Sequence, residues 1–302
     1  MKRISPYIRL MRPANIITAI ADILAGTAVA VAAPRLRDEM WERYHHAHIA
    51  VLWLIVATAG LYAGSIVFND IFDSRLDQLE RPERPIPRGD VSVRQATILA
   101  VCLLFIAILA AGQVAGVSVG LACSIAILAL VYNAWGKHQQ ILGPLNMGLC
   151  RGGNLLLGIS CSPRALAAWW FISLVPICYV SAITMISRGE VHGTHRSVLW
   201  VGLGLYTAAV IGLLWLAIVL ATAILPILLF ISLFSYYVYR PLVRALHERE
   251  AQYVRQAVKA GVLGIILLDA TRVAIFAGWP YGIMVALLLP ASQQMAYYFS
   301  VT

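Results

Sequence analysis

The stretch "VLWLIVATAGLYAGSIVFNDIFDSRLDQLERPERPIPRG", residues 51–89, changes character near its middle. Residues 51–68 contain no charged side chain, whereas residues 68–89 contain five acidic and four basic ones. An apolar run of about 20 residues is long enough for a helix to cross a bilayer. The stretch therefore predicts a membrane-spanning helix that ends in a dense group of acids.

The composition of the rest of the chain agrees with a membrane protein. Of 302 residues, 61% are hydrophobic and 12% are charged, whereas soluble domains carry about 25% charged residues. These numbers predict an all-α integral membrane protein, a single polytopic domain over 1–302 whose halves are 1–161 and 162–302. Nine spans are expected, at 13–33, 48–69, 93–113, 115–135, 143–161, 168–187, 197–217, 219–239 and 258–276.

Two apolar segments allow a second interpretation. The first one follows basic residues and ends in "AVAVAAP", as a secretory signal would. Because it is long and contains Asp22, we expect a retained first helix. A tenth segment, 280–298, is interrupted by Pro290 and either crosses the bilayer or lies along its surface.

The basic residues predict the orientation in the membrane. Seventeen of the 23 Lys and Arg residues fall at the N-terminus or in the even-numbered loops, and four fall in the odd-numbered loops. Cytoplasmic loops carry this excess, so we expect a cell-membrane protein with a cytoplasmic N-terminus. The bias also explains the net charge of +9, and no nucleic-acid partner is expected.

The acids at 70, 73 and 77 are spaced for a metal site. Together with Asn69 they fall within about 100° of one helix face. Crowded carboxylates repel one another, and a hard divalent cation such as Mg²⁺ relieves that cost. The alternative is a solvated loop in which these acids pair with nearby arginines, namely Arg75, Arg81, Arg84 and Arg88.

Several motifs resemble the UbiA superfamily of intramembrane prenyltransferases. "NDIFDSRLD" and "RPIPRG" are similar to the family's first acidic motif and the loop that follows it. "YNAWGK" resembles the Tyr-x-x-x-x-Lys that follows the fourth helix, and "LGPLNMGLCRGG" resembles the start of the fifth. "RPAN" is similar to the family's first helix at its beginning.

The resemblance implies a bundle of about nine helices around a central cavity. It implies that Asn69, Asp70, Asp73 and Asp77 bind Mg²⁺, with Lys137, Arg84 or Arg88 on the phosphate oxygens. Aromatic rings would stabilise the allylic cation, although packing or an interfacial belt explains such residues equally well. The aromatic residues near the right helix ends are Tyr62, Phe68, Tyr132 and Tyr179.

The family's second acidic motif is degenerate here, where the chain reads "TMISRGEVHGTHRS". Three hypotheses follow. Glu190, with or without His192, ligates a metal; Arg188 binds the diphosphate in place of the second ion; or catalysis is weakened or lost. The "SRGEV" form resembles the EboC branch of the superfamily.

Ionisable residues inside the spans mark function or pairing. Arg151 and Asn154 share one face of the fifth span, and we expect Arg151 to face the cavity; the alternative is a pair with Asp22. Asn15 is expected near the substrate, at the beginning of the first span. Asp269 and Arg272 are expected to form an internal ion pair.

The basic segment 240–259, with the loop 240–257 inside it, is predicted to form an interfacial helix against anionic lipid.

The sequence as a whole predicts Mg²⁺-dependent transfer of a polyprenyl group from an allylic diphosphate to an aromatic or other lipophilic acceptor. The alternative is a non-catalytic protein that binds or transports isoprenoid diphosphates. The acceptor, the chain length and the oligomeric state stay open.

Overall fold

The computed structural model describes residues 5–32, 40–190, 195–248 and 250–298, and every regular element in these ranges is helical. In chain order, the described elements begin with α1 (Ser5–Met11), α2 (Pro13–Ala32), α3 (Met40–Phe72), α4 (Ser74–Glu80), α5 (Val93–Gly112), α6 (Gly116–Ala134) and the 3₁₀ turn η2 (Gly136–His138). The remaining elements are α7 (Leu142–Ile159), α8 (Pro163–Trp169), η3 (Trp170–Ser173), α9 (Leu174–Ser187), α10 (Arg196–Val219), α11 (Ile224–Glu248), α12 (Ala251–Phe276), α13 (Trp279–Ala286) and α14 (Leu288–Tyr298).

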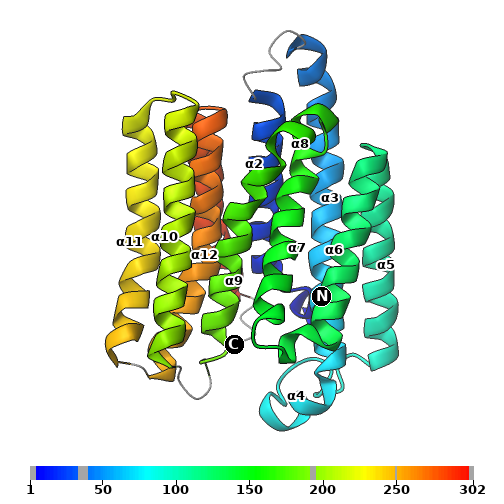
Figure 1. Ribbon diagram of the computed structural model, residues 1–302. Coiled ribbons are helices and arrows are strands. Elements are labelled where there is room, and N and C mark those ends of the chain that lie inside the picture. Colours follow the sequence, from blue (N-terminus) through cyan, green and yellow to red (C-terminus); the bar gives the residue numbers. More distant parts are fainter. Residues whose placement is uncertain (1–4, 33–39, 191–194, 249, 299–302) are drawn as a thin grey trace.

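Seven helical segments of the described chain are long and apolar enough to cross a membrane. They are α2, α3, α5, α6, the α8–η3–α9 segment, α10 and α11. The predicted spans 143–161 and 258–276 correspond to α7 and α12, which run alongside these helices in Figure 1. The predicted all-helical membrane fold is therefore confirmed, and the number of crossings stays a prediction.

The helices form a bundle in which α2 and α7 lie between two groups (Figure 1). One group contains α3, α5 and α6, and the other contains α9 to α12. Helix α4 projects at one end of the bundle, which we call the α4 end. This arrangement brings the first and the second half of the chain together along α2 and α7.

Glycines let α2 and α7 approach backbone to backbone. A Cβ on Gly26 would lie 2.4 Å from the Leu155 carbonyl oxygen, and one on Gly158 would lie 2.7 Å from that of Ile23. Small residues at such contacts allow the close packing on which membrane helices rely. The polar residues of α2 and α7 are thereby placed opposite one another.

Two segments differ from the expectation. Residues 240–259 do not form a separate interfacial helix, because α11 continues to Glu248 and α12 begins at Ala251. The apolar residues Leu242, Ala245 and Leu246 are buried in the core, so packing against the bundle decides the course of this segment. Residues 280–298 form two short helices, α13 and α14, in place of one long span.

Candidate active site

The first acidic motif lies where α3 passes into α4. Asn69 and Asp70 belong to the last turn of α3, Asp73 lies between the two helices, and Asp77 belongs to α4. Backbone hydrogen bonds run through the junction, from the Asp73 N–H to the Asn69 carbonyl (2.9 Å) and from the Asp77 N–H to the Asp73 carbonyl (2.8 Å). The helical spacing of these residues therefore persists. The sequence predicts one helix here, whereas the structure has two.

Each of the three carboxylates is paired with a cation. Arg12 donates to Asp70 over 2.5 Å, and Arg84 donates to Asp77 over 2.5 Å and to Asp70 over 3.4 Å. Lys137 donates to Asp73. Asp70 and Asp77 are 3% and 4% exposed, and carboxylates buried to this degree need a positive partner.

The guanidinium of Arg84 occupies a position that a metal ion would suit. One of its nitrogens, Nη1, contacts both Asp70 and Asp77, so these two carboxylates already share one positive charge. No group of three His, Cys, Asp or Glu residues in the described ranges is assembled for a metal. Mg²⁺ needs few protein ligands because water and phosphate complete its shell, and two carboxylates with the amide of Asn69 fit that requirement.

Arg12 was not among the predicted site residues. It lies in the break between α1 and α2, and its backbone φ is +45°. This left-handed conformation is unfavourable for residues other than glycine. Such strain is typical of functional positions. In this conformation, the side chain of Arg12 reaches Asp70, which is 58 residues away in the sequence. Only its place in "RPAN", beside a basic N-terminus, indicates it in the sequence.

The two arginines of the predicted phosphate loop differ. Arg84 is 5% exposed and belongs to the acid cluster. Arg88 forms a 3.5 Å ion pair with Asp90, and the side chains of both residues are exposed. The structure therefore brings Arg84 to the site and places Arg88 on the surface, where phosphate binding by Arg88 stays a prediction.

A cavity of about 240 Å³ adjoins the acid cluster at Arg12 and Asn69, which line it. Its polar lining includes Arg12, Asn15, Asn69 and the rings of Tyr62 and Tyr132. Its apolar lining comes from α3, α6 and α7, namely Leu61, Ile66, Ile125, Ala129 and Met147. The cavity therefore has the mixed character that a charged head group with a hydrocarbon tail requires.

The other two predicted aromatic residues do not line this cavity. Tyr179 is fully buried, packs on Tyr206 and Phe234, and donates to the Gly261 carbonyl over 2.8 Å. Phe68 packs in a small apolar cluster beside Leu10 and its neighbours. Both are core residues in the structure.

The degenerate second motif is divided between two places. Arg188 follows α9 and donates to the carbonyls of Lys137 (3.2 Å) and Gln139, so it holds the turn that carries Lys137. Glu190 is half-buried beside Arg81 and Arg255; burial raises the pKa of its carboxyl, and the two cations oppose that shift. Metal binding by Glu190 stays a prediction, and His192 lies outside the described residues.

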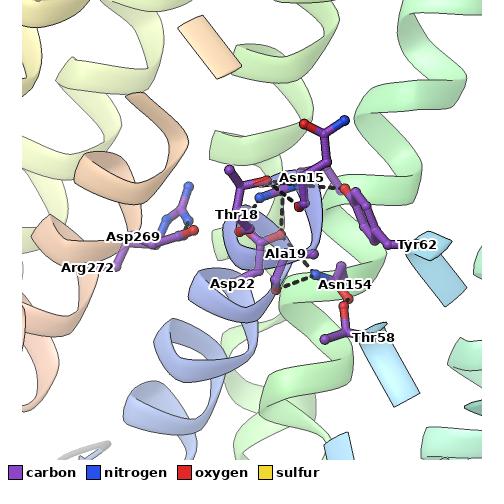
Figure 2. A network of polar contacts seen from close by, with 10 residues as sticks. Asn15, Thr18, Ala19, Asp22, Thr58, Tyr62, Asn154, Asp269 and Arg272 are labelled. Atoms are coloured by element: carbon purple, nitrogen blue, oxygen red, sulfur yellow. Dashed lines mark hydrogen bonds and ion pairs between the residues drawn. The ribbon is translucent and has the colours of Figure 1, made fainter. Parts of the chain in front are cut away.

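Arg151 belongs to a polar network inside the bundle, and its partners Thr18, Asp22 and Tyr62 are labelled in Figure 2. Its Nε is 2.5 Å from Asp22 Oδ2, and its Nη1 donates to Tyr62 Oη (2.6 Å) and Thr18 Oγ1 (3.3 Å). Asn154 donates to Asp22 and to the Ala19 carbonyl, both over 2.9 Å. The structure therefore shows the alternative interpretation for Arg151, which is an ion pair with Asp22.

The network meets the cavity at Tyr62 and at Asn15, whose carbonyl accepts a hydrogen bond from Thr18 over 2.8 Å. Thr58 completes the network by donating to Asn154 over 2.6 Å. Substrate binding by Arg151 or Asn154 therefore stays a prediction, since their donors are engaged by protein groups. Asp269 and Arg272 of α12 pair with each other and are fully buried, as expected.

The comparison with known proteins accords with this geometry. Residues 23–252 match the model of the UbiA prenyltransferase family. The chain belongs to this family. With its seven apolar helices, this UbiA family member is a multi-pass membrane protein.

Two relatives of this UbiA family member carry the same name. A digeranylgeranylglyceryl phosphate synthase of Methanothrix thermoacetophila is 30% identical over 182 residues, which are 60% of this chain and 61% of that protein. One from Ignicoccus hospitalis is 27% identical over 201 residues, 63% of this chain and 59% of the relative. The matches thus span about three fifths of the length of these relatives.

Solved structures share the fold. A structure of digeranylgeranylglyceryl phosphate synthase superposes with a TM-score of 0.68 and 17% identity, covering 92% of this chain and 99% of the other. A UbiA homologue from Archaeoglobus fulgidus bound to GPP and Mg²⁺ gives 0.59 and 14%, covering 93% and 99%. At such identities the likeness establishes the fold alone.

Proposed function

We propose that the chain is a prenyltransferase that uses Mg²⁺ to transfer a prenyl group from an allylic diphosphate to a lipophilic acceptor within the membrane. The observation that carries this proposal is the site at the α4 end. There, three carboxylates are paired with cations, and one of these cations, Arg12, lines a cavity that is partly polar and partly apolar. Family membership and the names of the relatives support the same activity.

The cations of the site bind the carboxylates when substrate is absent and the diphosphate when it is present. Without substrate, Arg12, Arg84 and Lys137 neutralise the carboxylates. When the diphosphate binds, Arg12 and Lys137, whose side chains keep contact with solvent, turn to its oxygens, where charge-assisted hydrogen bonds are strong. The acids thereby become available to the metal.

The reaction breaks the bond between the allylic carbon and the diphosphate oxygen, and the electron pair leaves with the diphosphate. A new bond forms between that carbon and the nucleophilic atom of the acceptor, whose proton passes to solvent. When bound by Asn69, Asp70 and Asp77, Mg²⁺ supplies charge that stabilises the departing diphosphate. The rings of Tyr62 and Tyr132 line the cavity, and their faces stabilise the allylic cation.

We further propose that the α4 end faces the cytoplasm. Arg75, Arg81, Arg84 and Lys137 belong to this end, in the even-numbered loops that hold most of the basic residues. The donor's diphosphate then enters from the cytoplasm, and its prenyl tail lies along the apolar part of the cavity. The Archaeoglobus fulgidus homologue is bound to GPP and Mg²⁺, which supports a prenyl diphosphate and Mg²⁺ as the ligands proposed for this chain.

A second candidate function is non-catalytic binding of an isoprenoid diphosphate. The observation that favours it is the position of Glu190, the one acid of the degenerate motif, which lies beside Arg81 and Arg255 and shares no cation with the acid cluster. A binder keeps the donor intact, whereas a transferase releases diphosphate.

One assay separates the two functions. Purified protein is given radiolabelled geranylgeranyl diphosphate and candidate lipophilic acceptors, with and without Mg²⁺, and bound donor, released diphosphate and prenylated acceptor are measured. We expect release that depends on Mg²⁺ and is lost in Asp70→Ala/Asp73→Ala. Asp90→Ala is the matched control because Asp90 pairs with Arg88 on the surface. Mg²⁺-dependent binding without release would favour the binder, and unchanged turnover in the double variant would refute the mechanism.

A further inference from the structure

Helix α11 lies at the outer edge of the bundle, and its last turns reach the α4 end (Figure 1). Among the seven apolar helical segments of membrane length in the described chain, it is the one least covered by the protein. Only 22% of its apolar window is buried, against 33% to 56% in the other six. Most of α11 therefore faces the surroundings of the bundle, which for a membrane protein are lipid.

One stripe of α11 changes from apolar to basic along the helix. Its members follow one another at intervals of three or four residues, so they share one face. They are Leu225, Leu229, Leu233, Tyr236, Arg240 and Arg244. The first four are 51% to 70% exposed, and both arginines are exposed as well. The stripe thus matches the profile of a phospholipid, with hydrocarbon beside the leucines and a head group beside the arginines.

A tyrosine orients each of the two arginines. The guanidinium of Arg240 lies 5.6 Å from the centre of the Tyr236 ring and donates to its hydroxyl over 2.7 Å. That of Arg244 lies 4.4 Å from the centre of the Tyr253 ring and donates to its hydroxyl over 3.3 Å. A guanidinium has five N–H donors, so each arginine is held in place and keeps donors for a further acceptor.

Neither arginine is neutralised by a carboxylate. Neither forms an ion pair within 4 Å with a described residue. The nearest acids in the sequence, Glu248 and Glu250, follow both arginines, and Glu250 accepts a hydrogen bond from Gln252 over 2.5 Å. At 1.5 Å per residue, Glu248 lies about 12 Å beyond Arg240 along the helix axis. The arginines therefore lie between the leucines and the acids, at the level where hydrocarbon gives way to head groups.

Other cations near this end are balanced in a different place. Arg255 and Lys259 line a cavity between Arg81 and α12, in which Glu80, Glu83 and Glu190 balance the three cations. Arg240 and Arg244 do not belong to that lining. The outer face of α11 thus carries positive charge that no carboxylate of the cavity offsets.

We propose that the end of α11 binds an anionic phospholipid of the leaflet at the α4 end. The phosphate lies between Arg240 and Arg244, where charge-assisted hydrogen bonds hold it, and an acyl chain lies along Leu229 and Leu233. A phosphocholine head group fits less well because its own ammonium group is repelled by the two arginines. The predicted contact of the basic segment with anionic lipid is thus placed on α11, and it does not depend on the proposed transfer reaction.

The test is a lipid titration of the full chain in detergent, followed by native mass spectrometry, which counts the bound lipids. The probes are phosphatidylglycerol and phosphatidylcholine with the same acyl chains. We expect the first phosphatidylglycerol to bind wild-type protein about tenfold more tightly than the first phosphatidylcholine. Arg240→Gln/Arg244→Gln should lower binding of phosphatidylglycerol about tenfold and leave binding of phosphatidylcholine unchanged.

A matched control removes the same charge from another part of this end. Arg75→Gln/Arg94→Gln changes exposed positions on α4 and α5, and it should bind phosphatidylglycerol as wild type does. Without added lipid, both double variants should unfold at the wild-type temperature, because all four substituted side chains are exposed.

Three outcomes would overturn the inference. Equal binding of the two lipids to wild-type protein would show that the head-group charge is not recognised. An equal loss in both double variants would assign the preference to the overall charge of this end in place of a site on α11. Displacement of phosphatidylglycerol by glycerol phosphate, which has no acyl chain, would show a site for a soluble anion.

Discussion

The acid cluster at the α4 end and the polar network around Arg151 contain the same types of ion pair, between aspartate and arginine, but they have different roles. In both, aspartates are buried against arginines that come from distant helices. At the α4 end, the partner Arg12 keeps a side chain that is 25% exposed, and Lys137 keeps 16%. In the network, Arg151 is 4% exposed and Asp22 is fully buried.

This difference decides which cluster can exchange partners. A cation that retains contact with solvent can leave its carboxylate for a phosphate without entering a dry environment. Arg151 has no such route, and its donors are divided among Asp22, Thr18 and Tyr62. Buried ion pairs of this kind are costly to break from one side only, so the network joins α2, α3 and α7 firmly.

The largest effect is expected where the network is broken. Arg151→Ala leaves Asp22 without its positive partner inside the bundle, which should cost about 3–5 kcal/mol of stability. Thermal unfolding in detergent, followed by gel filtration of the heated samples, measures the loss. Arg94→Ala, an exposed arginine on α5, should leave the unfolding temperature unchanged.

A paired substitution sharpens that result. Asp22→Leu/Arg151→Met removes both charges and should recover most of the stability, because neither partner is then left uncompensated. If the double variant is as unstable as Arg151→Ala, the ion pair is not the source of the loss.

At the α4 end, the expected effect is on turnover. Asp70→Asn keeps the shape of the side chain and removes the charge that Arg12 and Arg84 share, so release of diphosphate should fall about 10²- to 10³-fold. Stability should fall less than in Arg151→Ala, because Arg12 can reach solvent and Arg84 keeps its pairing with Asp77. Steady-state kinetics and thermal unfolding on the same sample separate the two quantities, and a fall in stability equal to that of Arg151→Ala would erase the contrast between the clusters.

A smaller effect is expected for Arg12, which we place on the donor's diphosphate. Arg12→Gln should raise the KM for the prenyl diphosphate about tenfold, as expected for one lost charge-assisted hydrogen bond. Arg9→Gln, an exposed arginine one turn earlier in α1, is the matched control. A donor KM that is the same in Arg12→Gln and wild type would leave Arg12 as a partner of Asp70 alone.

The smallest effect is expected for Arg188, because it acts through the turn that carries Lys137. Arg188→Gln should lower turnover less than tenfold, and less than Lys137→Gln does. In Lys137→Gln/Arg188→Gln the two losses should not add, as is usual for residues that act together. Additive losses would instead support a direct contact between Arg188 and the diphosphate; Arg196→Gln serves as control.

Local patterns in the sequence predicted much of the molecule. Apolar runs of membrane length predicted the helical membrane fold, and the spacing of Asp70, Asp73 and Asp77 predicted their common location. The match of "RPIPRG" and "YNAWGK" to a known family pointed to Arg84 and Lys137, which the structure pairs with those acids. The apolar runs and the spacing of the acids depend on neighbours within one or two helical turns, so the order of residues is enough to predict them.

The interactions between distant segments were decided by the tertiary structure. The pairing of Arg12 with Asp70, the choice of Asp22 for Arg151, and the cavity between Arg81 and α12 all depend on how helices are rotated and where they cross. Spacing along a helix tells which residues share a face, but it does not tell which face meets which neighbour. For this reason the sequence determined the membrane fold and the acids, and packing decided which arginines stabilise the bundle and which remain free for substrate.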